Sequence, residues 1–297
     1  MIIISIGGGL GNQMFEYAFY YKVKQLYPET IIKLDFFNTL GYSHNGYEIE
    51  RIFGLKSQEC TLEELKQVSD ICPVQKRFYK WCKFLEKIRH KIFGIKASCI
   101  VQQDATMFED KFYKIDIEKS YYFFGIFANY LFFNDIAEEI RNIYRFPMIV
   151  DERNKLWECT IKNTESVGIH IRRGDYIEWG IDLVPISFYR EAMSIIEKKV
   201  LGKAIHYFVF TDDVDYVKSE LCNVPNLQIV EGNEGTQSYI DMQLMSLCKH
   251  NIIANSTFSF WGAFLNRNAS KIVIAPKLPY TGCKHPFICD DWIVIDV

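Results

Sequence analysis

The chain has 297 residues, of which 49% are hydrophobic and 24% charged, a composition that excludes a disordered protein and allows one large or two modest domains. Its net charge of −3 argues against a surface that binds nucleic acid. Nine scattered cysteines without a C-x-x-C pair indicate reduced thiols rather than a disulfide framework. The start MIIISIGGG lacks the basic n-region of a signal peptide, and no apolar run reaches about 18 residues. We therefore expect a cytoplasmic protein, with peripheral binding at the inner face of the membrane as an open alternative.

The chain opens with a β-loop-α-β pattern. Residues 2–6 (IIISI) predict a buried strand, and a helical repeat of apolar residues follows from Asn12. Residues 30–37 predict a second strand, which ends near Asp35. This order is typical of the start of an α/β sheet.

The loop after the first strand, GGGLGNQ, is the first candidate for ligand binding. It does not fit G-x-G-x-x-G, because the sixth position falls on Asn12 or Met14 in the two possible registers. Asp35 keeps a dinucleotide alternative open, since an acid there could hold a ribose. The other interpretations are a tight turn capped by Asn12, or a sugar or phosphate loop. In the latter, Gly9 and Gly11 permit close approach, while Asn12 and Gln13 supply amides.

The middle of the chain contains a strongly basic segment. Thr61 and Glu64 form a capping box that predicts a helix start. In residues 75–92, seven Lys and Arg surround a helical stripe of Phe78, Trp81, Leu85, Ile88 and Ile92. Such a helix either contacts an anionic membrane surface or packs its stripe into the core. Residues 121–127 predict a strand and 134–144 a helix. The polar segment 147–163 is our candidate domain boundary.

The second half alternates strands and helices, which predicts a parallel sheet flanked by helices. Ser187 is the expected N-cap of the first long helix of this half. Strands are expected over residues 165–171, 204–210, 226–230, 251–255 and 271–275, with helices over 187–200, 215–221, 238–250 and 256–266.

Ligands bind such sheets beyond the carboxyl ends of the strands. The strand 165–171 is followed by Arg172, Arg173 and Asp175, where one arginine can grip a diphosphate and a carboxylate can hold the other. A surface Arg-Asp pair is the alternative. After 204–210, Asp213 and Asp215 have the D-x-D form, which leaves a helix cap, a nucleotide contact or a metal site open.

Two further elements point to the same edge of the sheet. After residues 251–255, Ser256 and Thr257 place hydroxyls and amides at a helix N-terminus, a suitable anion site. Phe258 follows as either a core residue or a wall of the site. Asp241 lies in the preceding helix and either reaches the site or faces solvent.

These stretches together resemble the bacterial α-1,2-fucosyltransferases of glycosyltransferase family 11. The resemblance lies in GGLGNQMFEYA (8–18), GIHIRRGDY (168–176), FTDD (210–213) and the long run DMQLMSLCKHNIIANSTFSFWGAFLN (241–266). It implies a GT-B type fold with two Rossmann-like lobes facing a cleft. The lobes would be residues 1–150, on the acceptor side, and 151–297, which binds GDP-fucose.

The resemblance also implies a chemistry. L-Fucose would pass from GDP-β-L-fucose to the 2-hydroxyl of galactose in a glycan, with inversion and without a metal or other cofactor. Arg172 would contact the β-phosphate, His170 and Arg173 would support that pocket, and Asn12 would lie near the fucose. The remaining expected substrate-binding residues are Gly9, Gly11, Gln13, Asp213, Asn255, Ser256, Thr257 and Phe258.

Inverting transfer needs balanced charge on departing GDP, a proton acceptor and exclusion of water. Arg172 is the expected electrostatic catalyst. Asp175 is our first candidate base and Glu178 the second, although an aspartate beside two arginines is a poor base. Other linkages, a nicotinamide-dependent oxidoreductase and a non-catalytic sugar-binding module are the alternatives.

Overall fold

The computed structural model describes residues 1–36, 45–68, 84–85, 88–89, 91–94, 97–102, 104, 107–277 and 288–297. The chain divides into two compact units, Met1–Ile143 and Tyr144–Val297, so the division precedes the expected boundary at 150. Most of the basic segment 75–92 lies outside the described residues. Within the described part of the chain, no helix has the length and apolar character needed to span a membrane.

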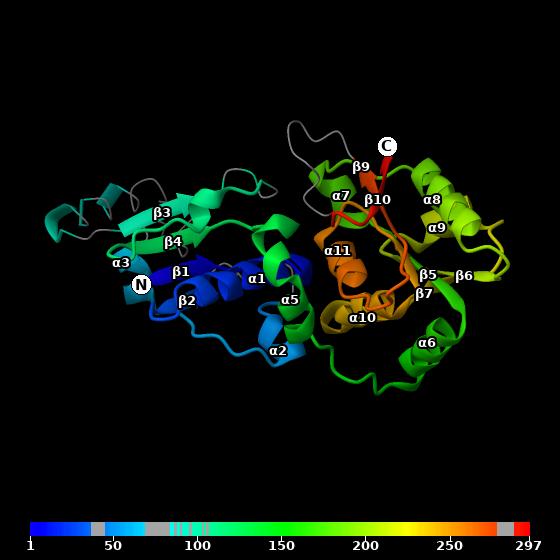
Figure 1. Ribbon diagram of the computed structural model, residues 1–297, viewed down its shortest axis with the longest axis horizontal. Coiled ribbons are helices and arrows are strands. Elements are labelled where there is room, and N and C mark those ends of the chain that lie inside the picture. Colours follow the sequence, from blue (N-terminus) through cyan, green and yellow to red (C-terminus); the bar gives the residue numbers. More distant parts are fainter. Residues whose placement is uncertain are drawn as a thin grey trace. The chain divides into compact units, whose positions relative to one another are not determined.

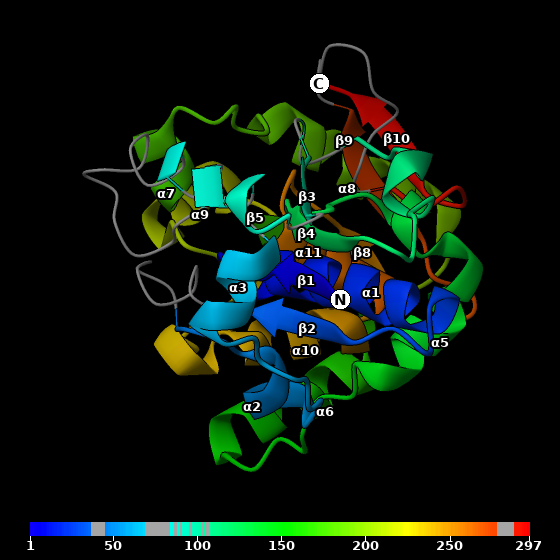
Figure 2. The ribbon, with the colours of Figure 1, turned by 90° about the vertical axis from the view of Figure 1, so that its left-hand side faces the viewer.

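The first unit contains a parallel four-stranded sheet in the order β2-β1-β4-β3. Figure 2 looks onto this sheet, with β2 at the bottom and β3 at the top. Its strands are β1 (Ile2–Ser5), β2 (Ile32–Asp35), β3 (Ala97–Val101) and β4 (Ser120–Phe124). The helices are α1 (Leu10–Leu26), α2 (Ile49–Phe53), α3 (Leu62–Val68) and α5 (Ala137–Ile143), with short 3₁₀ turns at Asp110–Phe112, Tyr130–Phe132 and Asn134–Ile136.

Alternate residues of these strands face opposite layers. Ile3 and Tyr122 pack with Leu65 of α3 on one face. On the other face, the ring centres of Phe19 of α1 and Phe123 lie 5.6 Å apart, within a large aromatic cluster. The high aromatic content therefore builds the core of this unit.

Two expected helix starts can be compared with the structure. The capping box is confirmed, since the amide of Glu64 donates to Thr61 Oγ1 at 3.2 Å and the amide of Thr61 donates to Glu64 Oε2 at 2.8 Å. The first helix begins at Leu10 with Gly9 as N-cap, so Asn12 lies inside α1 and is not its cap.

The second unit contains a parallel six-stranded sheet in the order β10-β9-β8-β5-β6-β7 (Figure 1). Its strands are β5 (Glu165–Ile171), β6 (Ile205–Thr211), β7 (Leu227–Val230), β8 (His250–Ile252), β9 (Val273–Lys277) and β10 (Ile293–Asp296). The helices are α6 (Glu152–Asn163), α7 (Gly174–Trp179), α8 (Ile186–Lys199), α9 (Val214–Leu221), α10 (Tyr239–Leu247) and α11 (Thr257–Phe264), with a 3₁₀ turn at Gly235–Gln237.

Helices cover both faces of this sheet. On one face, Ile169 and Val209 pack against residues of α8 and α9 such as Ile196 and Val217. On the other face, Phe208 packs with residues of α6 and α10, including Leu244. Figure 1 shows these two layers on opposite sides of β5 and β6. The expected α/β class with a Rossmann-like arrangement is confirmed.

One sequence expectation needs correction, and three elements of the structure were not expected. The cap of α8 is Pro185, and Ser187 lies within the helix. Part of the polar segment 147–163 is helix α6, whose buried Ile161 packs into the core of the second unit. Strands β3 and β10 had no expected counterpart. Each pairs with a neighbour already in its sheet, so their strand conformation depends on tertiary contacts rather than local pattern.

Candidate functional site

The candidate site lies where two central strands of the second unit end. His170 pairs with Phe210, and Ile171 with Thr211, in the parallel register of β5 and β6. Arg172 and Asp212 are therefore the first residues beyond adjacent strand ends. This is the edge where ligands bind in open α/β sheets.

Arg172 is held along one edge by two aspartates. Its Nε and Nη2 donate to the two carboxylate oxygens of Asp175, at 2.9 and 2.7 Å. Its Nε also lies 3.1 Å from Asp212 Oδ2. Burial opposes the charge of Arg172, but these aspartates outweigh it and raise the pKa of the guanidinium. Among the described residues, none forms a hydrogen bond or ion pair with Nη1, so this group remains available to a polar partner.

Arg173 is more completely engaged than Arg172. Its backbone amide donates to Asp212 Oδ1 at 2.8 Å, and its Nε donates to Asp213 Oδ2 at 2.9 Å. Its guanidinium carbon lies 3.6 Å from the centre of the Tyr216 ring, a cation–π contact. These contacts give Arg173 a fixed place beside Arg172.

Asp213 is the N-cap of α9. Its Oδ1 accepts the amide of Tyr216 at 3.1 Å while Oδ2 binds Arg173, and the hydrogen bond from Arg173 holds the pKa of Asp213 below its usual range. Of the three interpretations left open for the D-x-D residues, the structure shows the helix cap. In the described ranges, no cluster of three His, Cys, Asp or Glu has the geometry to hold a metal ion.

His170 and the start of α11 lie beside the arginines. His170 is buried, its ring centre is 5.5 Å from that of Phe258, and its Nδ1 has no hydrogen-bond partner in the described structure. Burial and the charge of Arg172 lower the pKa of His170 to about 3, so the imidazole is neutral. Ser256 caps α11 by accepting the amide of Phe258 at 3.3 Å, and Thr257 is the first residue of that helix.

Asn255 ties this helix start to α7. Its backbone carbonyl accepts the hydroxyl of Tyr176 at 3.1 Å, and its Nδ2 donates to the carbonyl of Asp182 at 2.9 Å. Its Oδ1 is buried and lacks a partner within the described residues. Buried polar atoms without partners, such as these on His170 and Asn255, are typical of functional sites and of places that hold a water or an ion.

The glycine loop of the first unit is stabilised by Gln13. This buried side chain donates from Nε2 to the carbonyls of Gly8 and Gly46, at 2.9 and 2.8 Å, and accepts the amide of Glu48 at 2.8 Å. Gln13 therefore shapes the loop through backbone groups, in place of the direct ligand contact expected from sequence. Gly8 has φ of +70°, and Gly9 and Gly11 follow it at the start of α1.

The two acids near this loop do not point to a dinucleotide. Asp35 is fully buried and accepts the hydroxyl of Tyr122 at 2.7 Å, so it does not present a carboxylate to a ribose. Glu16 is buried as well, and it accepts the amide of Gly7 at 2.7 Å. Burial raises the pKa of Glu16 well above its usual range, and the hydrogen bond from Gly7 opposes that rise.

Comparison with known proteins decides the family. The model of Glycosyl transferase family 11 matches residues 1–295. The chain belongs to glycosyltransferase family 11. The "O-antigen biosynthesis glycosyltransferase WbnK" of Escherichia coli is 30% identical over 97% of this chain and 98% of that protein. An "Alpha-1,2-colitosyltransferase" of the same species is 28% identical over 93% and 91%.

A solved structure supports the fold of this family 11 chain. The NodZ alpha-1,6-fucosyltransferase, in crystals soaked with GDP-fucose, superposes with a TM-score of 0.50 at 17% identity, covering 89% of this chain and 92% of NodZ. The expected GT-B type fold with two Rossmann-like lobes is thereby confirmed. The oxidoreductase alternative is excluded by the family.

Several residues of this family 11 site were missed or left open. Asp212 contacts both arginines, and a Cβ at position 174 would approach its Oδ2 closely, at 3.0 Å. Its signals in the sequence were the Asp-Asp pair after a strand and the FTDD motif (210–213). Asp241 accepts Asn233 Nδ2 at 2.7 Å, and burial raises its pKa to about 7. Glu178 is exposed on α7.

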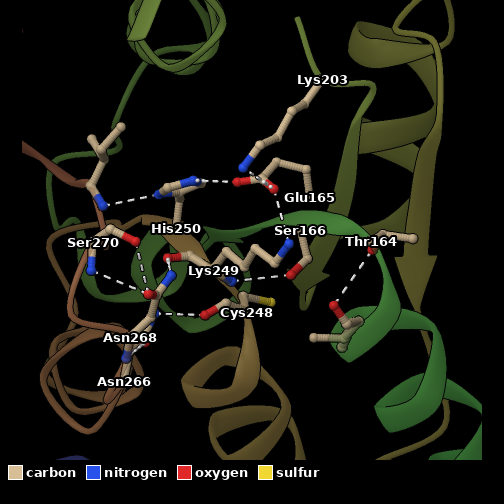
Figure 3. Close-up of polar contacts among 12 residues, drawn as sticks. Thr164, Glu165, Ser166, Lys203, Cys248, Lys249, His250, Asn266, Asn268 and Ser270 are labelled. Carbon is tan, nitrogen blue, oxygen red and sulfur yellow. Dashed lines mark hydrogen bonds and ion pairs between the residues drawn. The ribbon is translucent and has the colours of Figure 1, made fainter. Parts of the chain in front are cut away.

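The amino ends of the same strands carry a different cluster, drawn in Figure 3. Glu165 Oε2 accepts Lys249 Nζ at 2.9 Å and Lys203 Nζ at 3.0 Å, while Oε1 lies 3.1 Å from His250 Nε2. The amide of Ile272 donates to His250 Nδ1 at 3.0 Å, which places the proton on Nε2. These bonds join β5, β8 and the segment before β9, at the opposite ends of the strands from Arg172.

Proposed function

We propose that this family 11 chain transfers L-fucose from GDP-β-L-fucose to the 2-hydroxyl of a galactose residue in a glycan, with inversion and without a metal ion. The observation that carries the proposal is the open Nη1 edge of Arg172 beyond β5, while two aspartates hold its other edge. A guanidinium fixed in this way is oriented before the substrate arrives, and its positive charge can stabilise the negative charge that develops on the departing diphosphate.

The aspartates around Arg172 limit the side from which a phosphate can approach it. Arg172 and Arg173 are matched by Asp175, Asp212 and Asp213, so the cluster is not an open cationic patch. The carboxylates lie on the bonded edges of the guanidinium groups. In the proposal, a phosphate oxygen approaches Nη1 of Arg172, away from the Nε edge that the aspartates occupy.

The neighbouring residues support nucleotide binding. Neutral His170 offers an unpartnered Nδ1, and Asn255 an unpartnered Oδ1, to polar atoms of the donor. The N-terminus of α11, with Ser256, Thr257 and Phe258, adds amides and hydroxyls suited to a phosphate. Asn12, Gly9 and Gly11 of the first unit stay expected substrate-binding residues, and Gln13 holds their loop.

The hydrogen bonds of Asp175 argue against its role as the catalytic base. Both oxygens of Asp175 already accept hydrogen bonds from Arg172, so we assign Asp175 to positioning that arginine. In the proposal, the hydroxyl of galactose loses its proton late in the reaction, when the fucose ring carries substantial positive charge. Glu178 on α7 is the remaining candidate for the base that takes this proton.

One relative supports the proposed linkage but suggests a different donor sugar. The name of the colitosyltransferase relative supports the α-1,2 linkage, but it names a different sugar. Colitose is fucose without the 3-hydroxyl, so the two donors differ by one polar group. A galactose acceptor is supported by the resemblance of GGLGNQMFEYA and GIHIRRGDY to bacterial α-1,2-fucosyltransferases.

The test is incubation of the full chain with GDP-fucose or GDP-colitose and galactose-ended oligosaccharides, with the linkage read by NMR. We expect an α-1,2-fucoside. In Arg172→Ala, loss of the phosphate contact should cost about 3–4 kcal/mol of transition-state stabilisation, a hundred- to thousandfold in rate. Arg190→Ala, an exposed arginine of the same unit paired with Glu220, is the matched control and should retain activity. Near-normal turnover by Arg172→Ala would refute the proposal.

A further inference from the structure

We propose that Trp179 stacks against the galactose ring of the acceptor, an inference that rests on the proposed transfer reaction and adds a binding residue to it. Trp179 is the last residue of α7, the helix that begins just after Arg172 and Arg173. It is 58% exposed, whereas Trp261 and Trp292 have exposed fractions of 0% and 7%. An indole ring left in solvent beside the candidate site is available to a ligand.

Helix α7 is held in place by polar contacts at both of its ends. All six of its residues are described, and none of them is buried. The hydroxyl of Tyr176 donates to the carbonyl of Asn255 at 3.1 Å. Asn255 Nδ2 donates to the carbonyl of Asp182, just beyond the helix, at 2.9 Å. The core therefore does not account for a large apolar side chain at position 179, although the helix that carries it is fixed.

Trp179 lies on the face of α7 that holds the first arginine. It follows Asp175 by four positions, which places the two side chains on the same face, about 6 Å apart along the helix. Both carboxylate oxygens of Asp175 accept hydrogen bonds from Arg172. The reacting sugar of the acceptor must come close to the diphosphate that Arg172 binds in the proposal, wherever the rest of the glycan lies. One helical turn is about the width of a sugar ring, so Trp179 is within reach of that sugar.

The surroundings of Trp179 favour a neutral sugar over other ligands. Glu178 and Asp182 are exposed on either side of it in the sequence. Their carboxylates repel an anionic lipid or a nucleic acid and can accept hydrogen bonds from sugar hydroxyls. Galactose has one apolar face, formed by the C–H groups at carbons 3, 4 and 5, which fits against an indole ring. Its 2-hydroxyl lies at the edge of the ring, so stacking leaves this group free to react.

The experiment compares Trp179→Ala, Trp179→Leu and Trp179→Phe with the parent. Saturation-transfer NMR of a galactose-ended oligosaccharide with the full chain and GDP requires no donor sugar. We expect the protons at carbons 3, 4 and 5 of galactose to be saturated most strongly in the parent and in Trp179→Phe, and weakly in the other two variants. In turnover, the KM for the oligosaccharide should rise roughly tenfold in Trp179→Ala and nearly as much in Trp179→Leu, while the affinity for GDP stays unchanged.

Ile177→Ala is the matched control. Ile177 is 55% exposed on the same helix, but it follows Asp175 by two positions and so lies on the opposite side from Trp179. This variant should keep the parent KM, GDP affinity and thermal unfolding. A KM for the oligosaccharide within about twofold of the parent in Trp179→Ala or Trp179→Leu would overturn the inference. Loss of GDP affinity in Trp179→Ala would overturn it as well, because it would indicate a structural role.

Two results separate this inference from the proposed function. A parent that forms no α-1,2-fucoside, but whose saturation of galactose is lost in Trp179→Ala, would refute the transfer reaction and support the stacking. A parent that forms the fucoside, but shows no saturation of galactose, would refute the stacking alone. Light scattering tests another occupant of this surface. A dimer that Trp179→Ala converts to a monomer would make Trp179 part of an interface between two copies of the chain, and the inference would be wrong.

Discussion

Asp175 and Arg172 form a two-pronged ion pair at the start of α7, with both carboxylate oxygens bonded to the guanidinium at 2.9 and 2.7 Å. The two residues are three positions apart in the chain, with Arg172 just before the N-cap of α7 and Asp175 in its first turn. Asp212 adds a second carboxylate from the end of β6. Arg172 is therefore held by the first turn of α7 and by the residue that follows β6, which fixes the direction of its open edge.

The first prediction separates positioning from base catalysis at Asp175. Asp175→Asn keeps one acceptor but loses charge and one hydrogen bond, so we expect kcat to fall about ten- to hundredfold. The acid limb of the pH profile of kcat/KM should keep its position, because Asp175 does not take up the proton. GDP release at a series of pH values measures both quantities. Disappearance of the acid limb in the variant would identify Asp175 as the base.

The second prediction concerns the glycine loop and Gln13. In Gln13→Glu, two donors to the carbonyls of Gly8 and Gly46 are lost, and a carboxylate is buried against those oxygens. We expect the free energy of unfolding to fall by about 2–4 kcal/mol, measured by urea denaturation.

Gln25→Glu is the matched control for Gln13→Glu. Gln25 lies on the same helix, but its side chain forms an exposed hydrogen bond to Glu139. Its replacement should cost less than about 1 kcal/mol. Equal losses in the two variants would show that Gln13 does not hold the loop.

Local pattern was enough to predict most of the second sheet and the residues at its strand ends. Strand 165–171 and the residues after it were placed correctly because β-α alternation and strand ends are local features. The role of Gln13 was not predictable, because its partners Gly46 and Glu48 are more than thirty residues away in the chain. The pairing of both Asp175 oxygens with Arg172 likewise depends on side-chain geometry that adjacency alone leaves open.

The third prediction concerns metal dependence. Asp213 is occupied as a helix cap and as the partner of Arg173, whereas Asp215 is exposed in the first turn of α9. We expect fucosyl transfer to continue at an unchanged rate with EDTA, and Asp215→Asn to have nearly the parent kcat. Loss of activity with EDTA that Mn²⁺ restores would instead assign metal binding to the D-x-D residues.

The fourth prediction concerns stability at acidic pH through the Glu165 cluster. Burial alone would raise the pKa of Glu165, but hydrogen bonds from Lys249, Lys203 and His250 outweigh it and lower the pKa to about 2. Because the folded pKa lies below the unfolded value of about 4.3, the stabilisation is complete above that value and is lost as the pH falls towards 2.

Glu165→Gln should therefore reduce the free energy of unfolding by about 2–3 kcal/mol near neutral pH, since hydrogen bonds to a buried charge are lost. The difference between parent and variant should shrink as the pH falls below about 4, in urea unfolding at a series of pH values. Glu152→Gln is the control, because Glu152 is 90% exposed in its pair with Lys155. Its effect should stay within about 0.5 kcal/mol. A Glu165→Gln difference that does not change with pH would mean that the loss comes from packing and not from the charge of Glu165.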